Sequence, residues 1–156
     1  MFKEFLQKYN ITEKRIAVGV SGGSDSLALA LMLNDELLPL GYCVIAITVD
    51  HRLRPTSAQE AEKVASIMAQ NGIKHHTLVW EHTSTLKTGI EEAARIARYN
   101  LIENWCEQNN VKVFMTAHHL NDQVENFFIR LQRGSGLDGL CGMKESVAKN
   151  NLQIMR

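Results

Sequence analysis

The stretch that decides the fold reads Arg15-Ile16-Ala17-Val18-Gly19-Val20-Ser21-Gly22-Gly23-Ser24-Asp25-Ser26-Leu27-Ala28-Leu29. A short apolar run ends in two glycines and three serines, and apolar residues then recur at helical spacing at Leu27, Leu31 and Leu38. The pattern predicts a strand over 15–20, a tight loop and a helix that runs to about residue 38. Residues 21–26 are called the SGGSDS loop from here on.

The SGGSDS loop has the composition of a phosphate-binding turn. Gly22 and Gly23 lack the side chains that would block a close approach or a positive φ. The backbone N–H groups at the start of the following helix attract an anion, and the three serines add hydroxyl donors. Asp25 would repel a phosphate unless a cation lay between them, which implies Mg²⁺ at Asp25. An ordinary capped helix start is the alternative, because Ser and Asp are also preferred N-cap residues.

Composition limits the classes of protein that this chain fits. It has 156 residues, 45% hydrophobic and 22% charged, which suits one globular domain with a sizeable core. Seventeen basic residues balance seventeen acidic ones, so any nucleic-acid site must be a local patch. Cys43, Cys106 and Cys141 form no CxxC pair, which argues against a disulfide scaffold or a zinc ribbon. With no signal peptide or apolar span at the N-terminus, we expect a cytoplasmic protein.

Strand-like and helix-like patterns alternate along the whole chain. The predicted strands cover 15–20, 43–49, 73–80 and 111–117. The predicted helices cover 1–10, the stretch up to about 38, a stretch that starts at Thr56 or Ser57 and ends before Gly72, 90–109 and 118–133. Such alternation predicts an α/β fold with a Rossmann-like parallel sheet, helices on both faces and right-handed crossovers.

Polar side chains follow three of the predicted strands at their carboxyl ends, where ligands bind in parallel sheets. The SGGSDS loop follows the first strand. The segment VDHRLR, with Asp50 and His51, closes the second strand and would meet the adenosine half of a nucleotide bound at the first loop. A solvated charged turn is the alternative for that segment.

The helix GIEEAARIARY carries two arginines that need separate explanations. Arg95 lies three and four residues after two glutamates, so a surface ion pair accounts for it. Arg98 has no acidic residue three or four positions away, which favours a role in clamping phosphate.

The segment TAHHLNDQVEN follows the predicted strand 111–117. His118, Asp122 and Glu125 are spaced i, i+4 and i+7 and share a face of the predicted helix, with His119 beside them. Such a face could ligate a metal, hold a substrate ammonium or act as a base. A polar helix start with a favourable dipole for Asp122 is the alternative.

The segment RGSGLDGLCGM, residues 133–143, has four glycines in nine positions. From residue 130 to residue 156 five basic residues stand against two acidic ones. We expect a nucleic-acid contact there through phosphates, with Arg133 among the contacting residues. A surface loop without a partner is the alternative.

Taken in order, these segments resemble the N-terminal domain of the tRNA(Ile)-lysidine synthetase family, within the PP-loop ATP pyrophosphatases. The resemblance covers residues 18–143. It implies an adenine nucleotide alpha hydrolase-like fold and a ligase that uses ATP. In that reaction AMP is placed on the C2 oxygen of the wobble cytidine of tRNA(Ile), and the ε-amine of L-lysine displaces it to give lysidine.

The resemblance also implies roles for particular residues. The SGGSDS loop, with Asp50 and His51, would bind ATP, and Asp25 would hold Mg²⁺. Arg98 would contact nucleotide phosphates or tRNA, and the histidines would line the site. Asp122 and Glu125 would position lysine. The catalytic candidates are therefore Asp25, Arg98, His118, Asp122 and Glu125, and the candidates for substrate binding are Asp122, Glu125 and Arg133.

Two departures from the family pattern limit what is carried over. The family has an acidic residue where Asn121 stands and Thr where Asn126 stands, so neither residue is assigned a role. The family also continues beyond the equivalent of Arg156. We therefore expect residues 1–156 to be a PP-loop ATPase domain without the tRNA-binding C-terminal domains, with weak or absent activity in isolation.

Other functions stay open at this level. Another PP-loop ATP pyrophosphatase is the nearest, such as a tRNA thiolase or a protein like GMP synthetase. The lack of paired cysteines disfavours thiolation. A nucleotide-binding module without catalysis is the alternative from another class. A homodimer is compatible with the sequence, which does not fix the oligomeric state.

Overall fold

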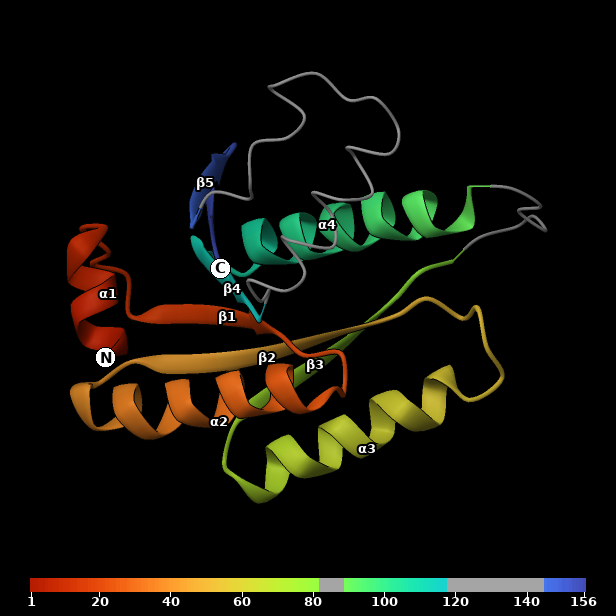
Figure 1. Cartoon of the computed structure of the whole chain (residues 1–156), viewed down its shortest axis with the longest axis horizontal. Helices are drawn as coiled ribbons and strands as arrows, with labels where there is room; N and C mark the ends of the chain where they lie inside the picture. The colour runs from red at the N-terminus through yellow and green to blue at the C-terminus, as the bar shows by residue number, and fades with distance from the viewer. Residues whose placement is uncertain (82–88, 118–144) are drawn as a thin grey trace, which may run out of the picture.

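The structure is a computed structural model that describes residues 1–81, 89–117 and 145–156 (Figure 1). Its strands are β1 (Arg15–Gly19), β2 (Cys43–Asp50), β3 (Lys74–Val79), β4 (Val113–Thr116), β5 (Ser146–Lys149) and β6 (Leu152–Met155). Its helices are α1 (Phe2–Lys8), α2 (Ser24–Leu37), the short 3₁₀ helix η1 (Leu38–Leu40), α3 (Ser57–Gln70) and α4 (Ile90–Gln108). Within these ranges, no helix combines the length and the apolar character needed to cross a membrane.

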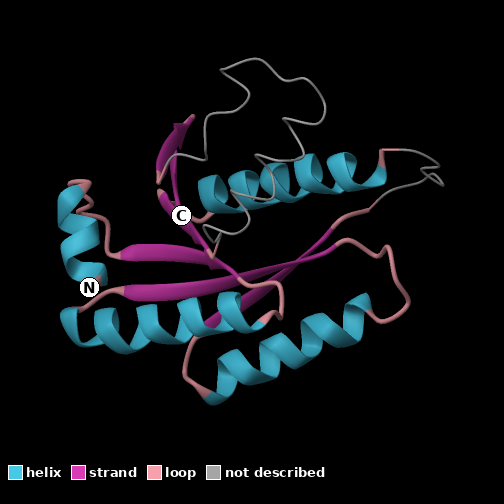
Figure 2. Cartoon of the chain, viewed as in Figure 1, coloured by secondary structure: helices cyan, strands magenta, loops and turns pink. Residues whose placement is uncertain are grey.

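The six strands form one sheet in the order β3-β2-β1-β4-β6-β5. The four pairs from β3 to β6 are parallel, and β5 alone pairs antiparallel with β6 at the edge. The helices lie on both faces, with α2 and α3 on one and α4 on the other (Figure 2). The predicted α/β class and Rossmann-like arrangement are confirmed.

The β5–β6 hairpin is a finding that the sequence analysis did not anticipate. Its turn is formed at Asn150, whose φ of 52° lies in the left-handed region that asparagine tolerates. The four predicted strands pair in parallel, and the unpredicted β5 is an antiparallel strand at the edge of an otherwise parallel sheet. The four predicted strands all exist, with ends that differ from the prediction by at most two residues. The helix predicted over 118–133 lies outside the described residues.

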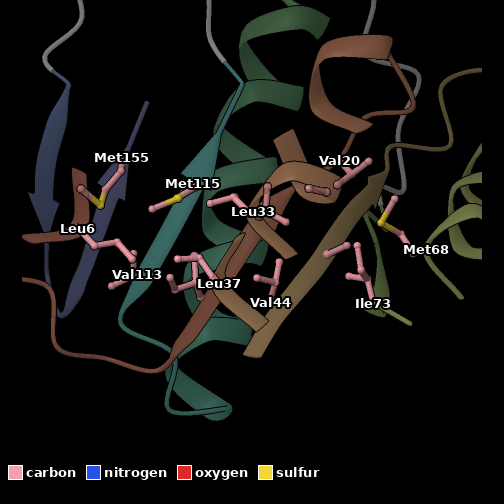
Figure 3. Packing of buried hydrophobic residues seen from close by; sticks show 14 of the residues in the cluster. Leu6, Val20, Leu33, Leu37, Val44, Met68, Ile73, Val113, Met115 and Met155 are labelled. Atoms are coloured by element: carbon pink, nitrogen blue, oxygen red, sulfur yellow. The ribbon is translucent and has the colours of Figure 1, made fainter. Parts of the chain in front are cut away.

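The core beneath α2 and α3 combines alternate residues of three central strands with the inner faces of these helices (Figure 3). In α3 the apolar spacing predicts an inner face of Ala61, Val64, Ala65 and Met68, of which Ala61, Val64 and Met68 are buried and Ala65 is partly buried. In α2 the buried face contains Ala30, Leu33 and Leu37, whereas the Leu38 predicted in the helical pattern is exposed. Because α2 is apolar nearly all round, its periodicity could not select the inward face.

The opposite face of the sheet packs against α4. Ala17, Ile45 and Phe114 from the central strands meet Ile102 and Cys106 from the helix. The central strands are therefore buried on both sides, as the continuous apolar run over residues 43–49 predicts.

This topology places a crevice between β1 and β4. From β1 the chain crosses by α2 to β2 and by α3 to β3, moving outward in one direction. It then returns through α4 to β4 on the other side of β1. The direction in which strands are added therefore reverses between β1 and β4, and the carboxyl ends of the strands at such a reversal are where doubly wound sheets bind ligands.

Candidate nucleotide site

The SGGSDS loop joins the carboxyl end of β1 to the start of α2. Gly22 has a φ of 91°, and a Cβ atom at that position would lie 3.3 Å from Val64 Cγ2. Glycine is therefore required there for its backbone angle as well as for space. Gly23 is extended, with φ of −70° and ψ of 152°, and caps α2. The positive φ expected of this glycine pair occurs at Gly22 alone.

Ser26 closes the loop from within. Its hydroxyl donates to the carbonyl oxygen of Gly23 at 2.9 Å and accepts from the backbone N–H of Ser21 at 3.1 Å. The Ser21 hydroxyl lies 3.3 Å from the same oxygen. These contacts hold the loop in one shape and leave the N–H groups of the first turn of α2, which have no partner inside the helix, at its mouth.

Ser24 and Asp25 are exposed on that first turn, and the Ser24 hydroxyl lies 3.3 Å from a carboxylate oxygen of Asp25. A carboxylate and a hydroxyl are hard oxygen donors of the kind that Mg²⁺ accepts. Among the described residues no group of three or more His, Cys, Asp or Glu side chains could hold a metal ion. Phosphate oxygens could serve as further ligands of a magnesium ion at Asp25, which is how Mg²⁺ is usually held beside nucleotides.

The end of β2 supplies Asp50 and His51. Asp50 is buried and accepts the backbone N–H of Arg52 at 2.9 Å, which supports the left-handed φ of 51° at that arginine. The ring of His51 meets the ring of Trp80 edge to face, with centroids 5.9 Å apart. Burial and the positive charge of Arg98 lower the pKa of His51, so its imidazole is neutral at neutral pH. Both β2 residues are thus held rigidly beside an aromatic wall.

The two arginines of α4 differ as the sequence predicts. Arg95 forms a two-pronged ion pair with Glu92, with nitrogen–oxygen distances of 2.8 and 2.7 Å, on the surface. Within the described ranges, Arg98 makes no salt bridge, and it lines a cavity instead. Its guanidinium lies 5.5 Å from the centre of the Tyr99 ring. A cation that pairs with no carboxylate in the described part of the chain, and that lies over an aromatic ring beside a cavity, is suited to bind an anion.

That cavity has a volume of about 360 Å³, within the range of small-molecule sites. Its walls come from the carboxyl ends of β1, β2 and β4, the start of α3 and the inner face of α4. The polar lining residues are Ser21, Ser26, Thr48, Asp50, His51, Arg54, Ser57, Glu60, Arg98, Tyr99 and Thr116. Strand ends distant in sequence therefore meet at one site, at the crevice that the topology defines.

The structure brings together some of the predicted site residues and not others. Ser21, Ser26, Asp50, His51 and Arg98 all line the cavity. The middle of the SGGSDS loop, residues 22–25, does not line it and stands exposed beside it. The predicted His118, His119, Asp122, Glu125 and Arg133 lie outside the described residues. Thr116 and Ala117, which precede them in the sequence, line the cavity.

Sequence reasoning missed several cavity residues. Thr48 lies within an apolar run, and nothing in the pattern marks it as more than a strand residue. Tyr99 becomes significant only through its contact with Arg98, as does Trp80, which is not among the lining residues, through its contact with His51. One sequence signal could have identified Thr48: it is a single threonine in a strand otherwise buried on both faces.

A parallel sheet with a glycine-rich loop at the topological switch point, and an arginine facing that loop's cavity, defines an α/β protein that binds phosphorylated nucleotides. The sequence model of the PP-loop domain matches residues 1–156. The chain therefore belongs to the PP-loop family, whose members bind ATP.

Curated relatives narrow the comparison. The chain is 40% identical over 157 residues to a tRNA(Ile)-lysidine synthase of Wolbachia pipientis, a match that covers 100% of this chain and 36% of the relative. It is 44% identical over 133 residues to a tRNA(Ile)-lysidine synthase of Zymomonas mobilis, covering 85% of this chain and 39% of the relative. The chain thus spans little more than a third of the length of these relatives.

Among solved structures, the fold is similar to that of the U34-tRNA thiolase NcsA from Methanococcus maripaludis. The TM-score is 0.77, and the match covers 99% of this chain and 58% of the other at 17% sequence identity. At that identity the likeness supports the fold and carries no statement about the reaction.

Proposed function

We propose that the protein is a ligase that joins L-lysine to C2 of the wobble cytidine of tRNA(Ile) at the expense of ATP. The observation that carries the proposal is the cavity in which the SGGSDS loop, Asp50, His51 and Arg98 meet in a chain 40% identical to a tRNA(Ile)-lysidine synthase. The match covers 36% of that relative, so the activity of the whole relative is carried over here as a proposal.

The proposed reaction has two steps. The C2 oxygen of cytidine attacks the α-phosphorus of ATP, so that one phosphorus–oxygen bond forms and pyrophosphate leaves. The ε-amine of lysine then attacks C2, and AMP departs with the former carbonyl oxygen. A ring carbonyl has no leaving group of its own, and adenylation supplies one.

Different described residues bind different parts of the nucleotide. The first-turn N–H groups of α2 and the serine hydroxyls bind the β and γ phosphates, where an anion is favoured by the helix dipole. Arg98 neutralises charge that develops on the departing pyrophosphate. Neutral His51, held against Trp80 and next to Asp50, forms the wall on the adenosine side.

Asp25 would hold the magnesium ion of the proposal, together with phosphate oxygens of ATP. When bound, the ion supplies positive charge that offsets the repulsion between Asp25 and the phosphates. The exposed carboxylate of Asp25 on the first turn of α2 supports this assignment.

The acceptor half of the site is assigned from the sequence alone. Asp122 and Glu125 would bind the lysine ammonium and take its proton before attack, since carboxylates can do both. His118 would line the site beside them, and Arg133 would contact the tRNA backbone. A homodimer and a cytoplasmic location, where tRNA, ATP and lysine are all found, belong to the same proposal.

The test follows products in an assay of the whole protein with α-labelled ATP, tRNA(Ile) and lysine. The proposal expects AMP, pyrophosphate and one lysidine per tRNA, with lysidine formed only when lysine is present. ADP and orthophosphate as products would contradict it. AMP release at the same rate with and without tRNA and lysine would contradict the assignment of these two substrates. The isolated 156-residue chain is expected to turn over weakly or not at all.

A further inference from the structure

Thr48 is the one hydroxyl residue of β2 and is buried, with 6% of its surface exposed. It lines the nucleotide cavity, and by the alternation of strand residues it lies on the same face of β2 as Val44 and Ala46, the face that packs against α2 and α3. A buried hydroxyl destabilises the folded protein unless it is hydrogen-bonded, so the two hydrogen-bond partners of Thr48 indicate its role.

The two hydrogen bonds of Thr48 have fixed directions. Thr48 Oγ1 lies 2.8 Å from the carbonyl oxygen of Val20 and 2.8 Å from Nε2 of His75. A carbonyl oxygen can only accept, so the single hydroxyl proton of Thr48 is donated to Val20. His75 must then donate its Nε2–H to Thr48. The contacts form a directed chain from the edge strand β3 through β2 to the end of β1.

Val20 is the residue that precedes the SGGSDS loop. Its N–H donates to the carbonyl of Ile47 at 2.8 Å, so both of its backbone polar groups are held by β2. The carbonyl of Val20 and the N–H of Ser21 belong to one planar peptide unit. That N–H donates to Ser26 Oγ at 3.1 Å. The first peptide of the loop is therefore anchored on one side by Thr48 and on the other by Ser26.

From this geometry we propose that Thr48 is a positioning residue for the phosphate-binding loop, supported by His75. Rotation of the Val20–Ser21 peptide would break the Ser21–Ser26 contact and release the loop from the shape that directs its N–H groups. The inference rests on the proposed function only in that the SGGSDS loop binds the phosphates of ATP.

The test compares Thr48→Val, which keeps the shape and removes the hydroxyl, with Thr48→Ser, which keeps the hydroxyl. The dissociation constant of ATP is measured by calorimetry without tRNA or lysine, and KM values for ATP and lysine are measured in the full reaction. Thr48→Val is expected to weaken ATP binding and raise its KM about fivefold, the effect of one neutral hydrogen bond, while the KM for lysine stays within twofold. Thr48→Ser is expected to restore most of the ATP affinity.

Unfolding by urea is followed in parallel, because loss of the hydroxyl also removes the partner of the Val20 carbonyl oxygen and of His75 Nε2. Should Thr48→Val fail to fold, His75→Leu serves instead, since His75 is only partly buried; it is expected to weaken ATP binding about twofold to threefold. Folded Thr48→Val with wild-type ATP affinity would overturn the inference, as would a Thr48→Ser protein as impaired as Thr48→Val. If His75→Leu is the variant measured, unchanged ATP affinity of that variant would overturn the inference.

Two further outcomes separate this inference from the proposed function. If the wild-type protein binds ATP but forms no lysidine, the proposed function is refuted. The ATP affinities of the two Thr48 variants then still test the role of Thr48. Wild-type protein that binds no ATP would overturn both.

Discussion

Replacing Gly22 by alanine should weaken ATP binding through the backbone of the SGGSDS loop. Gly22 has a φ of 91°, and the new Cβ would lie 3.3 Å from Val64 Cγ2. Holding a residue with a Cβ at positive φ costs about 1–2 kcal/mol. The alanine variant therefore either carries that cost in its folded state or relaxes the loop away from the conformation described here.

If the loop relaxes, ATP must restore its conformation on binding, and the same 1–2 kcal/mol appears as a loss of affinity of about fivefold to thirtyfold. If it does not relax, the cost appears in the free energy of unfolding. Titration calorimetry with ATP and urea unfolding of the same preparation measure the two parts separately.

Gly72→Ala is the matched control. Gly72 has a φ of 68°, and a Cβ there would meet nothing within 4 Å. It follows the end of α3 and does not line the nucleotide cavity. Its variant is expected to lose about 1 kcal/mol of stability with unchanged ATP affinity. Unchanged stability and unchanged ATP affinity in the Gly22 variant would refute the reasoning, because the loop would then need no positive φ. Equal losses of affinity in both variants would show that the effect is not local.

Three further outcomes are expected. Arg98→Gln should weaken ATP binding roughly tenfold through loss of a charge-assisted contact, whereas Arg95→Gln, which breaks only a surface ion pair, should leave calorimetric ATP affinity unchanged; equal effects would contradict the separate roles. Burial lowers the folded-state pKa of both His51 and His75, so the unfolded chain binds more protons around pH 6. The free energy of unfolding should therefore fall as the pH drops from 7.5 to 5.5, and a flat profile in urea titrations would count against this. Burial raises the pKa of the Cys106 thiol to about 12, so peptide mapping after iodoacetamide treatment at pH 8 should find Cys106 modified only in unfolded protein; rapid labelling of folded protein would show that it is not buried.

The parts of the fold that were predictable are those whose signal is local. The glycine pair after an apolar run predicts the turn, and Ala61, Val64 and Met68 identify the inner face of α3. The inward face of α2 was not predictable, because a helix that is apolar nearly all round has no distinct periodicity. The β5–β6 hairpin was not predictable either, since its four-residue strands depend on pairing with β4 and on the bend at Asn150.

The candidate site likewise has features that the sequence predicts and features that it does not. That Ser21 and Asp50 meet at one cavity follows from the rule that ligands bind at the carboxyl ends of parallel strands, whereas Arg98 of α4 was identified because no acidic residue lies three or four positions from it. That Thr48 holds the Val20 carbonyl could not be predicted, since the contact joins two strands by a single side-chain hydroxyl. The roles of Asp122 and Glu125 stay predictions from the sequence.

The most direct test of the central claim is a crystal structure of the protein with lysine and an ATP analogue whose α–β bridge resists cleavage. The account expects the β and γ phosphates on the N–H groups of the SGGSDS loop, Arg98 against the phosphates, and the lysine ammonium beside Asp122 and Glu125. A nucleotide bound away from that loop would contradict the account.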